Sequence, residues 1–176
     1  AADNSYRGGT TVTSGTLAIS GAAADAGSGA VTLGANTLDL RDSAAPANAV
    51  TVNGGSITTT GTLSLTALAG GINQTGGSIE AGGAATVSAS GGAAVKLDRA
   101  GNDFATISVN APGSTVTLRD GNDVVLGATT AANLTVEAGS VQGTGGITQS
   151  GPLVVSGSST FTARGFGNIT LTHPDN

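Results

Sequence analysis

The sequence of 176 residues predicts an all-β fold, and within that class a right-handed parallel β-helix (solenoid). We expect roughly eight rungs of about 20 residues each. Three observations predict it: short strings of alternating polarity, an internal repeat, and a composition with 30 Gly, 1 Tyr, 3 Phe and no Trp. Small and β-branched side chains can fill the narrow core of a stack, whereas a globular core needs larger ones.

The alternation is of period two, with an apolar residue at every second position and Thr, Ser, Asn or Asp between. Such strings are typical of half-buried strands. Clusters of Gly, Asn, Asp and Ser close each string, as turns require. No apolar stripe of helical period is present, and the Ala-rich run 21–27 is predicted to be a loop. The apolar positions of the strings are Val12, Leu17, Ile19, Val31, Leu33, Leu38, Leu40, Val50, Val52, Leu63, Leu65, Val95, Leu97, Ile107, Val109, Val116, Leu118, Leu134, Val136, Ile169 and Leu171.

The repeat relates residues 70–102 to residues 145–176. Gly70–Gly76 recurs as Gly145–Gly151, and the same offset sets Thr86 against Phe161. Val95–Leu97 then matches Ile169–Leu171, where the offset is shorter by one residue. A repeat of this kind predicts an array of stacked coils.

A shorter period lies inside the longer one. Ala30–Leu33 recurs as Ala49–Val52, and Thr37–Leu40 aligns with Ser56–Thr59 at the same offset. Thr16–Ile19 precedes the similar string at Thr37 by a slightly larger offset. These offsets are the basis for the expected rung length of about 20 residues.

A β-sandwich is the competing all-β fold. It would need longer strands, inward aromatic residues and hairpin turns, for example at Gly54–Gly55 or Gly91–Gly92. The short strings and the scarcity of aromatic residues favour the β-helix. Right-handed coiling is expected from the usual handedness of parallel crossovers.

Net charge and cysteine content indicate which partners the protein is not expected to bind and in which compartment it is expected to fold. The net charge is −5, and the six basic residues are scattered, which argues against nucleic-acid binding. The chain has no Cys, as suits a rod that is exported through an oxidising compartment before it folds. No apolar stretch is long enough to span a membrane, and the first residues do not resemble a signal peptide. We therefore expect one continuous solenoid segment over residues 1–176, excised from a longer array.

Two families of bacterial exoprotein share motifs with this chain. Residues 4–17, NSYRGGTTVTSGTL, followed by Gly27–Leu33, resemble the passenger-associated repeat of bacterial autotransporters. Gly71–Gln74, Asn102–Phe104 and Gly167–Leu171 resemble repeats of filamentous-haemagglutinin-like exoproteins. On this basis residues 1–66 are expected to be autotransporter-type repeats and residues 67–176 a haemagglutinin-like tandem repeat.

The resemblance implies a stalk or passenger segment of a secreted or surface-displayed adhesin of a Gram-negative bacterium, associated with the outer membrane. The implied partners are a protein or glycan on a host or neighbouring cell, reached through the full-length protein, and an outer-membrane transporter or the protein's own β-barrel for export. End-to-end self-association through Thr10–Ile19 or Asn168–Thr172 is expected as well, because exposed strand edges recruit other edges. No enzymatic activity and no cofactor are expected.

Calcium binding is a weak alternative, carried by Asp103 and Asp123. Each follows Gly-Asn, as in half of a calcium-binding nonapeptide repeat. Those repeats place tandem copies nine residues apart, whereas these two copies are separated by about one expected rung. A tight turn, in which Gly supplies a positive φ and the Asn or Asp side chain bonds the backbone, is the preferred explanation of both copies, although the spacing would let them stack on neighbouring rungs.

Two further functions are possible for a β-helix. Cleavage or binding of a polysaccharide would use clustered acidic and basic residues, of which Asp98, Arg99 and Asp103 are the densest group, while His173 has no partner in sequence. Ice binding would use Thr-x-Thr pairs aligned on one face; a solvated strand also favours Thr. The candidate pairs are Thr11 and Thr13, Thr58 and Thr60, Thr115 and Thr117, and Thr170 and Thr172.

Overall fold

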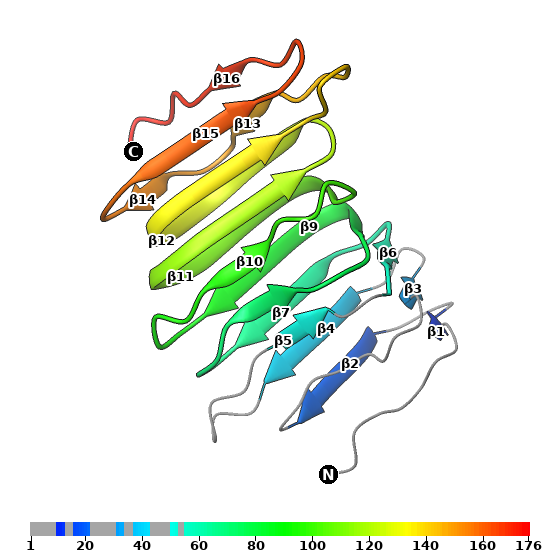
Figure 1. Cartoon of the computed structure of the whole chain (residues 1–176). Helices are drawn as coiled ribbons and strands as arrows, with labels where there is room; N and C mark the ends of the chain where they lie inside the picture. Colours follow the sequence, from blue (N-terminus) through cyan, green and yellow to red (C-terminus); the bar gives the residue numbers. More distant parts are fainter. Residues whose placement is uncertain (1–9, 13–15, 22–30, 34–36, 43–49, 53–54) are drawn as a thin grey trace.

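The structure, a computed structural model, describes residues 10–12, 16–21, 31–33, 37–42, 50–52 and 55–176. In those residues all regular structure is β-strand, and every strand pairing is parallel. The strands stack in successive coils, with β1 and β2 at one end and β16 at the other (Figure 1). The chain is therefore a β-solenoid, as the sequence predicts. The described part contains no helix that is long and apolar enough to cross a membrane.

Each coil has three faces, and the ladder of hydrogen bonds runs along each face from turn to turn. The first face holds β1 (Thr10–Val12), β3 (Val31–Leu33), β6 (Ile57–Thr59), β13 (Ile147–Gln149), β16 (Ile169–Thr170) and the first segments of β9 (Ile79–Ala89), β11 (Asp103–Asp120) and β12 (Val124–Ala138). The second face holds β2 (Thr16–Gly21), β4 (Thr37–Asp42), β7 (Leu63–Ala67), β14 (Leu153–Val155) and the middle or later segments of β9, β11 and β12. The third face holds β5 (Val50–Val52), β8 (Ile72–Gln74), β10 (Val95–Leu97), β15 (Ser159–Ala163) and the last segments of β11 and β12.

The described chain makes about five complete turns between Ile57 and Ala163. The first face continues beyond them, so that eight strands stack there among the described residues, in line with the expected number of rungs. The length of a turn varies along the chain. The turn from Val116 to Leu134 is several residues shorter than the turn from Val31 to Ile57.

The sequence contains two short offsets, one between Thr16 and Thr37 and a smaller one between Ala30 and Ala49, and only one of them is the length of a turn. The larger one is confirmed as a turn length, because Thr16 pairs with Thr37 on the second face. The smaller one is wrong as a turn length. Ala30–Leu33 and Ala49–Val52 overlap β3 and β5, which lie on the first and third faces of one turn. Thr37–Leu40 likewise stacks on β7 and not on Ser56–Thr59. The similarity reflects equivalent faces and not successive turns.

The interior is a narrow column of stacked side chains. Along the second face, Ala67, Ala89, Ala111 and Ala131 lie in register and are all buried. On the other faces aliphatic residues stack in the same way, and Phe104 is the largest buried side chain of the described residues. The core residues are Ile57, Leu63, Leu65, Ala67, Ile72, Ile79, Ala81, Ala85, Val87, Ala89, Val95, Leu97, Phe104, Ile107, Val109, Ala111, Val116, Leu118, Val124, Leu126, Ala131, Leu134, Val136, Ala138 and Ile147.

Glycine permits the close stacking of the corners between faces. Gly77 has φ of 65°, in the left-handed region that Gly adopts readily. A Cβ at this position would overlap the carbonyl oxygen of Gly55 on the preceding turn. The Ala-rich run 21–27 and the possible hairpin residue Gly54 lie largely outside the described residues, whereas Gly91 and Gly92 form a corner between parallel segments and no hairpin.

The two copies of the long repeat lie on different faces. β8 of the first copy is on the third face, whereas its counterpart β13 is on the first face. β9 is likewise matched by β14 and β15, one face further on. The offset between the copies is thus about three and a third turns of a solenoid with about 22 residues per turn. The copies have the same local path, rotated by one face.

The structure also corrects one register of the repeat. The offset that relates Gly70 to Gly145 sets Thr86 against Phe161. Thr86 is exposed and points outward, whereas Phe161 packs against the core. Val87, the next residue along the chain, is the true counterpart of Phe161. A slip by one residue turns every side chain of a strand to the opposite side, so the inward pattern identifies the correct offset.

A substitution at Val116 tests whether the alternate side chains of this strand point into the interior as assigned. It is fully buried on the third face, stacked between Val95 and Leu134. We expect Val116→Asp to lower the free energy of unfolding by about 4 kcal/mol or more, because a carboxyl group would enter the apolar column without a partner. The matched control is Thr117→Asp on the outer side of the same strand, with an expected change within about 0.5 kcal/mol. Urea denaturation of both variants measures the difference, and equal midpoints would show that the register is wrong.

Candidate functional site

Charged residues of the described chain gather along one edge of the solenoid. Between residues 63 and 164, the charged side chains lie on the third face, in the corner that follows it, or at the start of the first face, where Asp103 is the neighbour of Glu80. Apart from Glu80, we call these residues the charged edge: Lys96, Asp98, Arg99, Asp103, Arg119, Asp120, Asp123, Glu137 and Arg164. The outward positions of the second face over the same turns carry Ser, Thr, Asn, Ala and Val instead.

The two Gly-Asn-Asp turns stack on neighbouring coils at this edge, as their spacing allows. The N–H of Gly121 donates to the carbonyl oxygen of Asn102 at 2.7 Å. Asp103 and Asp123 are both exposed, and Asp123 accepts a hydrogen bond from the N–H of Gly146 at 2.7 Å. In the described residues no group of three or more His, Cys, Asp or Glu side chains comes together as a metal site. Asp123 therefore has a structural role, since it accepts a hydrogen bond from the next turn.

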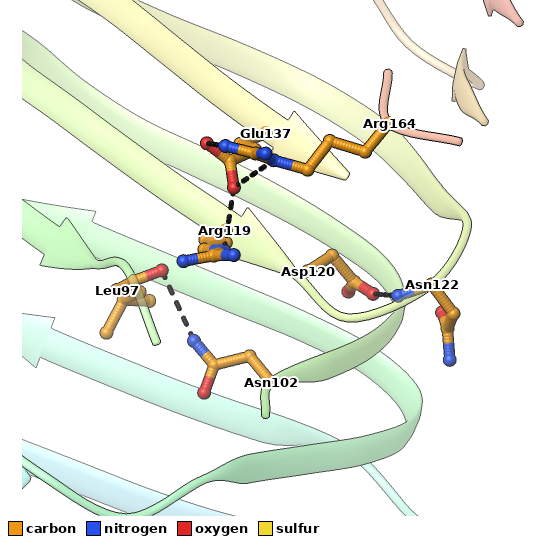
Figure 2. A network of polar contacts seen from close by, with 7 residues as sticks. All are labelled: Leu97, Asn102, Arg119, Asp120, Asn122, Glu137 and Arg164. Carbon is orange, nitrogen blue, oxygen red and sulfur yellow. Dashed lines mark hydrogen bonds and ion pairs between the residues drawn. The ribbon is translucent and has the colours of Figure 1, made fainter. Parts of the chain in front are cut away.

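Asp120 is the buried carboxyl group of the charged edge, with 1% of its surface exposed. Its carboxylate accepts a hydrogen bond from the N–H of Phe104 at 2.7 Å. It also accepts one from the N–H of Asn122 at 2.9 Å, which Figure 2 shows. Burial raises its pKa from 3.8 to about 6; the two hydrogen bonds lower it, and the charges of Asp103 and Asp123 raise it. Sequence analysis missed this residue. The signal is its position two residues after the inward Leu118, which places it in the inward register.

Asn102 and Gln74 form a buried amide pair that links two turns. Each side chain donates to the other, at 2.7 Å and 2.8 Å. Asn102 also donates to the carbonyl oxygen of Leu97 and accepts from the N–H of Ile79 at 3.0 Å. Asn102 lies in the corner between β10 and β11, and Gln74 is the last residue of β8. The pair therefore satisfies polar groups that would otherwise be buried without partners.

The same pair recurs in the second copy of the repeat. Gln149 and Asn176 exchange hydrogen bonds at 2.8 Å and 3.1 Å, and Asn176 accepts from the N–H of Leu153 at 3.0 Å. Leu153 is the counterpart of Ile79 in the first copy. The corner contacts thus follow the repeat although the two copies occupy different faces.

A clasp of three charged side chains crosses the outer side of the third face (Figure 2). Arg164 donates two hydrogen bonds to the carboxylate of Glu137, at 2.7 Å and 3.0 Å. Arg119, on the preceding turn, forms an ion pair with the same carboxylate at 2.8 Å. The hydrogen bonds from Arg164 hold the pKa of Glu137 below its usual range, and the charge of Arg119 acts in the same direction. The clasp joins three successive turns.

The residues considered for polysaccharide chemistry do not form one group. Asp98 pairs with Lys96 at 3.2 Å, and Arg99 donates to the carbonyl oxygen of Thr75 at 2.5 Å. His173 lies 3.9 Å from Asp175, away from both. Asp103 instead stacks on Glu80 at the rim of a shallow hollow of the first face, whose other lining residues are Thr58, Thr59, Thr60, Ala81 and Gly82.

The Thr-x-Thr pairs do not align into one array. Thr58 and Thr60 follow the first face, whereas Thr115 and Thr117 lie on the third. Thr170 lies on the first face five strands away from β6. Thr13 lies outside the described residues. Neighbouring rungs therefore present no repeated pair of these Thr residues.

The repeat architecture has a counterpart in a known family. A family model described as repeats of unknown function (DUF5649) matches residues 43–110 and 113–176, about three quarters of the chain. The chain belongs to this family. Neither the curated proteins nor the solved structures contain a match to it. Family membership agrees with the repeats seen in the sequence and with the solenoid, and it carries no assignment of activity.

The buried amide pair of this DUF5649 chain makes a testable contribution to stability. Asn102→Ala would leave the N–H of Ile79, the carbonyl oxygen of Leu97 and the amide of Gln74 with fewer partners. We expect a loss of about 3 kcal/mol in the free energy of unfolding, since each unpaired buried group costs about 1–3 kcal/mol. Asn176→Ala removes the exposed copy of the same pair and should cost less than about 1 kcal/mol. Thermal or urea unfolding compares them, and equal losses would contradict a role for burial.

Proposed function

We propose that this chain is part of the rigid, non-catalytic stalk of a secreted or surface-displayed adhesin of a Gram-negative bacterium. In this role the solenoid holds a more distal binding region away from the cell surface. The full-length protein would contact a protein or glycan of another cell, and an outer-membrane transporter would export it. The proposal rests on what the internal repeat keeps and what it changes.

The inward and corner residues are kept between the two copies. Gln74 and Asn102 recur as Gln149 and Asn176. The inward Ile72, Ala89 and Leu97 recur as Ile147, Ala163 and Leu171. These residues build the coil and satisfy its corners.

The charged outward residues are not kept. The first copy has Glu80, Lys96 and Asp98, for which the second has Val154, Thr170 and Thr172. Hydroxyl residues remain at other outward positions, where strands favour them. Because the copies also face different directions, a partner could not find the same charged surface twice. The repeat therefore supports a role in building length rather than a repeated binding site.

The cellular location and the export in this proposal are inferred from the sequence. A chain without Cys suits export through an oxidising compartment, and the motifs at residues 4–17 and 71–74 resemble those of exported bacterial proteins. One hollow of the described surface is lined by Glu80 and Asp103 without a basic residue, and a second hollow is lined by no charged residue. These features favour a stalk over the polysaccharide-cleaving and ice-binding alternatives.

Deletion of residues 71–145 tests the proposal. It joins Gly70 to Gly146 and removes about three and a third turns, so each following strand should find an equivalent position one face back; β13, for example, would take the place of β8 on the third face. We expect the shortened chain to fold and to lose about 16 Å of length, at about 4.8 Å per turn. Small-angle X-ray scattering measures the length. Within the full-length protein on bacterial cells, the deletion should weaken adherence by shortening the reach.

The matched controls change exposed outward residues of one face each. Thr148→Lys, Thr86→Lys and Thr135→Lys lie on the first, second and third faces. In the full-length protein we expect each to leave adherence within about twofold of the parent, because a stalk surface makes no specific contact. A folded variant that abolishes adherence would show that this segment is itself a binding surface, and the stalk proposal would fail.

A further inference from the structure

Three corners among the described residues use the same kind of side-chain contact, and one of the three differs chemically. Asn102 accepts a hydrogen bond from the N–H of Ile79, and Asn176 accepts one from the N–H of Leu153. Asp120 accepts the equivalent bond from the N–H of Phe104 on the neighbouring strand segment. The first two side chains are neutral amides. Asp120 is a carboxyl group, so this corner can gain or lose a proton.

The surroundings of Asp120 do not neutralise its charge. The charged residues on the elements packed against it are Glu80 of β9, Lys96, Asp98 and Arg99 of β10 and the turn after it, Asp103 and Arg119 of β11, and Asp123 and Glu137 of β12 and the turn before it. The basic residues are engaged elsewhere: Lys96 with Asp98, Arg119 with Glu137, and Arg99 with the carbonyl oxygen of Thr75. Asp103 and Asp123 are the charges that act on Asp120, and both repel its carboxylate.

We propose that the corner between β11 and β12 is a proton-operated joint of the solenoid, tightened when Asp120 takes up a proton and loosened when it is charged. A buried carboxylate loses its hydration, and the two N–H groups replace only part of it. Like charges nearby add to the cost. At the corners of Asn102 and Asn176 no such cost arises, because an amide carries no charge.

The direction of the pH dependence follows from linkage. The pKa of Asp120 is 3.8 when the group is free and about 6 in the folded chain, so the folded chain binds this proton more tightly. The extra stability is fully present below pH 3.8 and is lost as the pH rises through 6. Above that pH the contribution stays constant. The corner is therefore weaker at neutral pH than at pH 4.

The pH dependence of global unfolding would combine the contribution of Asp120 with an opposite contribution of Glu137, whose pKa is lowered by Arg164. A local measurement separates them. The amide groups of Phe104 and Asn122 donate to the Asp120 carboxylate, and that of Gly139 donates to the backbone carbonyl oxygen of Asp120. Hydrogen exchange at these amides reports the opening of this corner alone.

The experiment is hydrogen exchange, read by NMR from pH 4 to pH 7.5 and corrected for the intrinsic exchange rate. In the parent chain we expect the protection of Phe104 and Asn122 to fall by about a hundredfold as the pH rises, at a factor of ten per pKa unit. Asp120→Asn places at this corner the side chain that the Asn102 corner already has. Its protection should be the same at both ends of the range.

Two reciprocal variants complete the test. Asn102→Asp introduces a carboxyl group at the equivalent buried corner and should make the protection of Ile79 depend on pH in the same direction. Asn133→Asp changes an exposed side chain that accepts from the N–H of Ser158, and should show no such dependence. Protection of Phe104 that is flat or that rises with pH in the parent would overturn the proposal. So would an unchanged pH dependence in Asp120→Asn.

Discussion

The structure depends on how the backbone is satisfied where the chain turns from one face to the next. Along each face, parallel ladders pair the N–H and C=O groups of successive turns. At the corners the ladder shifts register or stops, as between Phe104 and Thr106, and buried donors lose their partners. Asn102, Asp120 and Asn176 supply those partners from side chains. Without these contacts the N–H groups of Ile79 and Phe104 would be buried without a partner; at other corners, such as those of Ile72 and Val124, a backbone carbonyl of the neighbouring turn accepts instead.

The same constraint explains what the repeat preserves. A copy that is displaced by about three and a third turns lies on another face, yet it keeps its inward residues and its corner Asn and Gln. The three faces of the solenoid are therefore equivalent as environments for the chain. The inward and corner residues are constrained on whichever face they lie, while outward residues such as Lys96 and its counterpart Thr170 are free to differ. Length can be added to such a molecule without designing a new surface.

Charge is placed where it disturbs the apolar column least. The clasp of Arg119, Glu137 and Arg164 lies on the outer side of the third face and joins turns through half-buried ion pairs at the surface. Asp120 is different because it lies inside the corner and must be either solvated by N–H groups or protonated. A solenoid with such a corner would respond to acidity locally while the rest of its ladder stays unchanged.

The sequence by itself determined the class of fold, since period-two alternation and small residues leave few other solutions. Pairs such as Val116 and Leu118 marked strands and their inward side correctly. Strands whose inward residue is polar or small, such as Ile72–Gln74 and Ile79 with Ala81, escaped the pattern. Only the tertiary structure decided which string stacks on which, because all three faces use similar residues and turn lengths vary. It also decided that Asp120 is buried, because the chemistry of a carboxyl group depends on neighbours that lie one turn away.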